Sequence, residues 1–89
     1  MIYVMSGDSG NANAYALINV IYPVGSTLTC SNGSKTLKCK NTLGAHTFAI
    51  PSNGTWTVTC TKGTDSVSQA VKITSKGQSE NVTLQYESW

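Results

Sequence analysis

The chain has 89 residues, with six lysines, no arginine and four carboxylates, and its formal net charge is +2. A chain of this length forms one domain with a thin core, which leaves no room for a deep catalytic cleft. Proteins that recognise nucleic acids rely on the bidentate arginine fork, so the lack of arginine argues against that class. No run of 18 apolar residues is present in the sequence, and we expect no membrane span.

The first 14 residues are expected to form a short arm, and residues 15–89 the folded domain. Ile2–Met5 can form a short strand, whereas the small polar residues from Ser6 to Asn13 are typical of a loop. The start of the chain has only five apolar residues and no basic residue before them, so it does not resemble a secretory signal. If the protein acts outside a cell, we expect it to leave by lysis or by assembly into a particle.

The segment Ala14–Tyr22 is apolar at almost every position, with Asn19 as the polar exception. A strand with two apolar faces is either central in a sheet or covered by another surface. Pro23 and Gly25 end this strand. The two-faced strand, the apolar start and the C-terminal tryptophan together suggest a contact surface for another subunit. The candidate attachment or interface residues are Ile2, Tyr3, Val4, Tyr15, Leu17, Tyr22 and Trp89.

Period-two segments of five to nine residues follow, with a turn signal between each pair. Asn32-Gly33 is typical of a tight hairpin, because it supplies the positive φ angles of a primed turn. This spacing predicts an all-β fold, a single antiparallel sandwich of about seven strands. The further expected strands are Ser26–Cys30, Lys35–Lys40, His46–Ile50, a strand from about Gly54 to Thr61, Ser66–Thr74 and Ser79–Tyr86.

Within these segments, one parity is apolar and is expected to face the core. In "GTWTVTCT", for example, the apolar residues alternate with threonines that suit a solvent-exposed pleated surface. All three cysteines fall on inward parities and are expected to act as small core hydrophobes, although a Cys30–Cys60 disulfide stays open. The candidate core residues are Leu28, Cys30, Leu37, Cys39, Phe48, Ile50, Trp56, Val58, Cys60, Val71, Val82 and Leu84. Gln69 shares its parity with Val67, Val71 and Ile73.

No set of residues in the sequence suggests catalysis, a cofactor or a metal site. The four carboxylates are not closely paired, and three of them fall in expected turns, the arm or the terminus. His46 stands at a strand edge, and neither a nucleophile elbow, a phosphate-binding loop nor metal-ligand spacing is present. The chain is therefore expected not to be an enzyme.

Each of two weaker patterns in the sequence has both a functional interpretation and one that needs no function. Lys35, Lys38, Lys40 and Lys62 can gather near one end of the sheet, either as a solvated face or as a surface that attracts a negatively charged partner. Three Asn-x-Ser/Thr sequences match the N-glycosylation pattern, but a sheet rich in Ser, Thr and Asn produces such matches by chance.

Several motifs resemble a small Ig-like module from tail and other structural proteins of phages and prophages of Gram-positive bacteria. The layout is also similar to the carboxypeptidase-regulatory-like, or prealbumin-like, sandwich. The resemblance covers about residues 18–86, and its motifs support a fold more directly than a function. The motifs are "P-x-G-S-T" at Pro23–Thr27, "NGSKTL" at Asn32–Leu37, "F-x-I-P" at Phe48–Pro51, "G-T-W-T-V-T" at Gly54–Thr59 and "T-S-K-G-Q-S" at Thr74–Ser79.

The resemblance implies a non-enzymatic accessory protein on the surface of a phage particle, which decorates the capsid or tail or aids adhesion. The implied partners are other virion proteins, further copies of the chain in a homo-oligomer and weakly bound surface glycans, with no nucleic acid, membrane or cofactor. The alternative is a soluble carbohydrate-binding or cell-surface adhesion module. That alternative needs exposed aromatic side chains at a common site.

Overall fold

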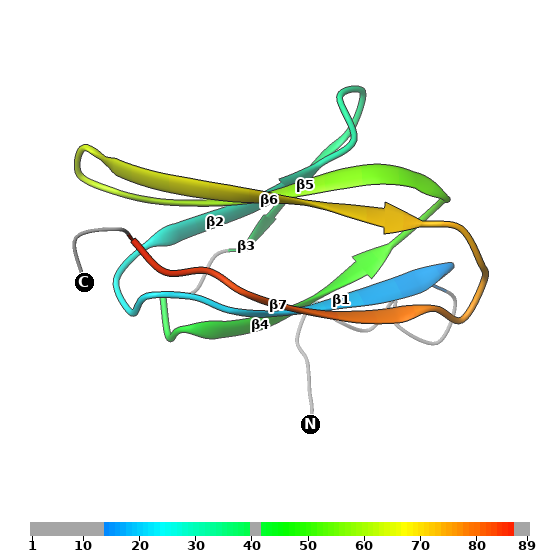
Figure 1. The fold of residues 1–89 in the computed structure, drawn as a ribbon, viewed down its shortest axis with the longest axis horizontal. Helices are drawn as coiled ribbons and strands as arrows, with labels where there is room; N and C mark the ends of the chain where they lie inside the picture. The colour runs from blue at the N-terminus through cyan, green and yellow to red at the C-terminus, as the bar shows by residue number, and fades with distance from the viewer. Residues whose placement is uncertain (1–13, 40–41, 87–89) are drawn as a thin grey trace.

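The computed structural model describes residues 14–39 and 42–86 and has seven β-strands in them (Figure 1). Within this described part there is no helix long and apolar enough to cross a membrane. The strands are β1 (Ala16–Ile21), β2 (Thr27–Ser31), β3 (Thr36–Cys39), β4 (Ala45–Ile50), β5 (Gly54–Lys62), β6 (Asp65–Ile73) and β7 (Ser79–Thr83).

The strands form a single β-sandwich, which confirms the predicted fold class. A three-stranded sheet of order β4-β1-β7 packs against a four-stranded sheet of order β3-β2-β5-β6 (Figure 1). Every pairing is antiparallel except that of β1 with β7, which is parallel. In a constant-type immunoglobulin domain the second and third strands lie in different sheets. Here β2 and β3 form a hairpin within one sheet, so the strand order differs from that of a constant-type immunoglobulin domain.

Strand β1 is the centre of the three-stranded sheet, which is one of the two arrangements expected for a strand with two apolar faces. Ala16, Ile18 and Val20 point into the core, and each is at most 3% exposed. The opposite parity, Leu17 and Ile21 with Asn19 between them, lies on the outer face of the sheet. One apolar face of β1 is thus left without a covering layer in the described residues.

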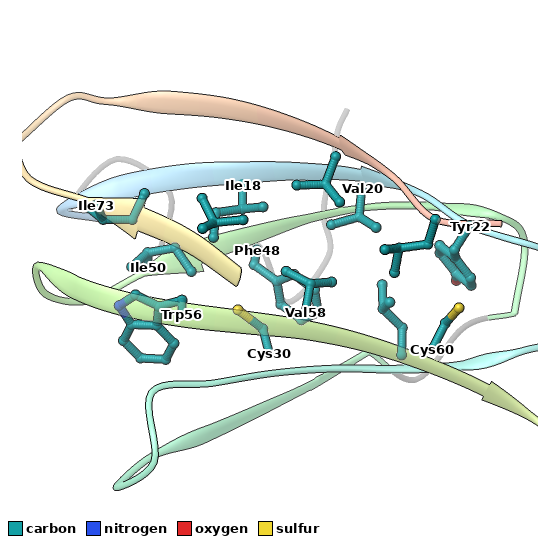
Figure 2. Close-up of a cluster of buried hydrophobic side chains, with 14 of the residues drawn as sticks. Ile18, Val20, Tyr22, Cys30, Phe48, Ile50, Trp56, Val58, Cys60 and Ile73 are labelled. Carbon is teal, nitrogen blue, oxygen red and sulfur yellow. The ribbon is translucent and has the colours of Figure 1, made fainter. Parts of the chain in front are cut away.

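The core lies between the two sheets and contains most of the residues expected there (Figure 2). Trp56, Val58 and Cys60 of β5 are completely buried, and the threonines between them lie on the other face of the sheet. Leu37 and Cys39 are only half-buried, because β3 is a four-residue strand at the edge of its sheet. The other buried members of the expected core are Leu28, Cys30, Phe48, Ile50, Val71, Val82 and Leu84.

The three cysteines are free, so the Cys30–Cys60 disulfide that the sequence left open does not form. The register explains why, since Cys30 lies opposite Val58 while Cys60 lies opposite Leu28. Diagonal neighbours on paired strands are about 7–8 Å apart at Cα, which is too far for an unstrained disulfide. Burial raises the pKa of the Cys30 thiol to about 12, as expected for a thiol that acts as a core side chain.

Gln69 shows where alternation alone misleads. It shares the inward parity of Val71 and Ile73, but it is exposed whereas they are buried. The reason is that β6 and β7 are free edges of different sheets, and a small groove of about 200 Å³ opens between them. Gln69 lines this groove together with Glu80 and Val82.

Candidate interaction surfaces

Three large apolar side chains are exposed in the described residues, and all three lie at the same end of the sandwich. Ile21 is 56% exposed, Val24 66% and Leu43 78%. Ile21 ends β1, Val24 lies in the turn to β2, and Leu43 lies just before β4, which starts at the end where β1 stops (Figure 1). We call these three residues the apolar end. Clustered exposed apolar side chains are typical of an interaction site, whereas scattered ones are not.

Hydrogen bonds hold the two loops of the apolar end against each other. The Tyr22 N–H donates to the Gly44 carbonyl at 2.9 Å, and the Gly25 N–H donates to the Thr42 carbonyl at 2.9 Å. From β5, the Lys62 Nζ reaches the Val24 carbonyl at 3.4 Å. The apolar end is therefore a pre-formed surface, which lowers the entropy that a partner must remove on binding.

Gly44 is needed where these loops approach each other. Its φ is +99°, and a Cβ added to it would lie 3.0 Å from Val24 Cγ2 and 3.2 Å from the Tyr22 carbonyl oxygen. Gly33, with φ +96°, has nothing within 4 Å of the same position. The two glycines thus share a backbone conformation that L-residues rarely adopt, but differ in steric room.

We expect Gly44→Ala to lower the free energy of unfolding by about 2–3 kcal/mol, because it adds a clash to the backbone strain. Gly33→Ala is the matched control and should cost only about 1 kcal/mol, since strain alone acts there. Urea denaturation followed by circular dichroism measures both. Equal losses for the two variants would show that the contact of Gly44 with Val24 and Tyr22 does not limit the loop.

The threonines of β5 lie on the outer face of the four-stranded sheet. Thr27 and Thr61 face each other across β2 and β5, as do Thr29 and Thr59. The hydroxyls of Thr59 and Ser68 are hydrogen-bonded at 2.8 Å. Cross-strand pairs of this kind stabilise a solvated pleated surface. The threonines therefore have a structural role in the sheet.

The outer face of the three-stranded sheet has no Lys, Arg, Asp or Glu among its strand residues. Its centre is a hydrogen-bonded row, in which Asn19 Nδ2 donates to Asn81 Oδ1 at 3.0 Å and to Ser79 Oγ at 3.2 Å. Thr47 Oγ1 donates to Asn19 Oδ1 at 2.8 Å, so the row crosses all three strands. The residues of this face are Leu17, Asn19, Ile21, Ala45, Thr47, Ala49, Ser79, Asn81 and Thr83.

The predicted interface residues do not form one surface in the described part. Tyr15 is half-buried and packs against the core, and Leu17 is half-buried on the outer face of the three-stranded sheet. The other candidates, apart from Tyr22, are Ile2, Tyr3, Val4 and Trp89, which lie outside the described residues.

The prediction that Tyr22 belongs to a contact surface is corrected, because its side chain lies in the core (Figure 2). It is 3% exposed, and its hydroxyl is 3.6 Å from Cys39 Sγ. Burial and the hydrogen bond with Cys39 raise the pKa of Tyr22 to about 12. The residue continues the inward parity of Ile18 and Val20 past the end of β1, a signal already present in the sequence.

The expected gathering of lysines is also corrected. Lys35 follows the turn between β2 and β3, whereas Lys62 ends β5 beside the start of β2. The two residues therefore lie at opposite ends of β2, and Lys40 lies outside the described residues. Lys38 lies opposite Thr29, between these two ends, so the described lysines of this group are spread along the sheet.

His46 and Glu80 each contact a neighbouring side chain. The His46 ring packs edge-on against Phe48, with ring centroids 4.7 Å apart and an interplanar angle of 80°. Glu80 accepts a hydrogen bond from Gln78 Nε2 at 2.7 Å. In the described ranges, no three His, Cys, Asp or Glu side chains are grouped so that they could hold a metal ion.

Aromatic side chains, which a sugar-binding platform requires, are mostly internal in the described residues. Tyr22, Phe48, Trp56 and Tyr86 are buried, and Tyr15 is half-buried. The Tyr86 hydroxyl is hydrogen-bonded to the buried Ser26 hydroxyl at 2.7 Å, beneath the turn that carries Val24. The carbohydrate-binding alternative therefore gains no support from these side chains.

Comparison with known proteins adds no assignment to this picture. No family model matches the sequence, and no curated protein is significantly similar to it.

Proposed function

We propose that the chain is a non-enzymatic accessory protein of a phage particle, which decorates the capsid or tail and attaches through the apolar end. The observation that carries the proposal is the position of Ile21, Val24 and Leu43, the exposed large apolar residues of the described part, at one end of the sandwich. The sequence resemblance to phage structural modules supports the choice of partner. Attachment by one end leaves both sheet faces displayed on the particle surface.

Val24 and Leu43 lie in loops and are 66% and 78% exposed, so a partner at the apolar end would cover most of both side chains. Burying an aliphatic side chain of this size is worth about 1.5–3 kcal/mol. Two such side chains on a pre-formed surface can supply the main apolar contact with a virion protein. Residues 1–14, with Ile2, Tyr3 and Val4, together with Trp89, are a second proposed contact.

The first test is protein mass spectrometry on gradient-purified particles from the source culture. We expect this chain to band with the particles at many copies. Recovery of the chain only in the soluble fraction would contradict the proposal. The next assay would then measure glycan binding by the free protein, with the change in tryptophan fluorescence as the readout.

A variant tests which surface attaches. We expect the double variant Val24→Ser, Leu43→Ser to lower the affinity for particles about a hundredfold, because two apolar contacts are lost. Thr57→Ser, on the outer face of the four-stranded sheet, is the matched control and should bind as the unchanged chain does. A third variant without residues 1–14 measures the second contact. Full binding by the double variant Val24→Ser, Leu43→Ser would exclude the apolar end as the attachment site.

A further inference from the structure

Among the described strands, four lie at sheet edges, and three of these carry features that prevent pairing with another chain. The edges are β4 and β7 in one sheet and β3 and β6 in the other. Free edges expose unpaired backbone groups, which proteins block with charged side chains, proline, bulges or very short strands. β3 has four residues including Lys38, β6 carries Asp65 and Lys72, and β7 carries Glu80.

Strand β4 has none of these features. It has six residues, none of which is Lys, Arg, Asp, Glu or Pro, and its register with β1 is continuous from Ala45 to Ile50. The Tyr22 N–H donates to the Gly44 carbonyl, and the bonded positions of an antiparallel ladder alternate. The backbone groups of Ala45, Thr47 and Ala49 therefore point away from β1, toward the open edge.

We propose that β4 pairs antiparallel with β4 of a second copy of this chain, with Thr47 opposite Thr47 at a two-fold axis. In this register, Ala45 of each copy faces Ala49 of the other. Every outward N–H and C=O group of β4 then has a partner. The two three-stranded sheets join into one continuous sheet of order β7-β1-β4-β4-β1-β7.

The side chains on the outer face fit this register. Asn81, Asn19 and Thr47 form the central row of each copy, and the two rows meet at Thr47. On either side of that row, Ile21 and Ala45 of one copy continue into Ala49 and Leu17 of the other.

The contact is thus self-complementary, as a two-fold interface requires. The small alanines let the strands approach, and none of the described strand residues on this face is Lys, Arg, Asp or Glu, so no charge among them opposes the contact. One strand pair buries less area than a standard interface, so we expect a weak dimer that forms only at high protein concentration.

The test uses sedimentation equilibrium of the 89-residue chain without particles, so its result does not depend on the proposed particle role. We expect a monomer–dimer equilibrium. The double variant Ala45→Lys, Ala49→Lys places like charges opposite each other twice and should raise Kd at least tenfold. The variant Ala45→Lys, Ala49→Glu has charges at the same positions, but opposite signs meet, so it should dimerise at least tenfold more tightly than the double-lysine variant.

Two further measurements make the assignment specific. Thr83→Lys adds a charge to β7, on the other edge of the same sheet, and should leave Kd unchanged. Amide hydrogen exchange of Ala45, Thr47 and Ala49 should slow as the concentration rises. The proposal fails if the chain stays monomeric up to about 1 mM, or if the double-lysine and charge-swapped variants behave alike. Slow exchange of these amides in a monomer would also overturn it, since another part of the same chain would then cover the edge.

Discussion

Trp56→Ala is expected to lower the free energy of unfolding by about 3–5 kcal/mol, which is a large share of the stability of a domain this size. Trp56 is the largest of the completely buried side chains and lies between the two sheets (Figure 2). Its removal leaves a cavity that the surrounding strands cannot fill, because their positions are set by backbone pairing on both sides of β5.

Trp56→Phe is the matched control for this loss. It keeps most of the apolar volume but removes the hydrogen bond from Trp56 Nε1 to the Ser52 carbonyl, which is 3.0 Å long. We therefore expect a loss of only about 1–2 kcal/mol. Urea denaturation followed by far-ultraviolet circular dichroism measures both variants. An alanine variant that loses less than about 1 kcal/mol would show that Trp56 does not lie in a packed core.

Alkaline pH should destabilise the protein strongly, because buried acids cannot ionise in the folded state. Burial raises the pKa of Cys30 from 9.0 to about 12. Between these values the unfolded thiol has lost its proton and the folded thiol has kept it, so the unfolded state binds fewer protons. The free energy of unfolding therefore falls as pH rises, by about 1.4 kcal/mol per pH unit above pH 9. Below pH 9 the contribution of Cys30 is fully present.

Tyr22 adds a second step at higher pH. Burial and the Cys39 hydrogen bond raise its pKa from 10.0 to about 12, so its contribution is lost as pH rises above 10. The window between pH 9 and 10 thus separates the thiol from the phenol. We expect urea denaturation of the unchanged chain to show a steep loss of stability in that window. Cys30→Ala, although less stable at pH 7, should show a shallower slope there. Equal slopes would rule out Cys30 as the cause.

The sequence alone was sufficient for the fold class and for most of the core. Side chains alternate between the two faces of a strand with a period of exactly two residues, so "WTVTC" separates Trp56, Val58 and Cys60 from the threonines without any knowledge of the partner strands. The hairpin at Asn32 was also predicted from a local signal, but its turn type was wrong: Gly33 has a positive φ and Asn32 does not, so the turn is not a primed one. The Oδ1 of Asn32 instead accepts hydrogen bonds from the Ser34 and Lys35 N–H groups across a longer turn. Tyr22 was misassigned although its parity with Val20 was visible.

Only the tertiary structure decided which strands are neighbours, and the candidate surfaces depend on that. The parallel pairing of β1 with β7 places Asn81 beside Asn19, from which it is 62 residues away in the chain. The turn after β1 and the loop before β4 bring Val24 and Leu43 to one end. These outcomes depend on long-range contacts, which the local alternation of side chains does not encode. The sequence also shows that β4 has no charged residue, but only the strand order places β4 at the edge of its sheet among the described strands.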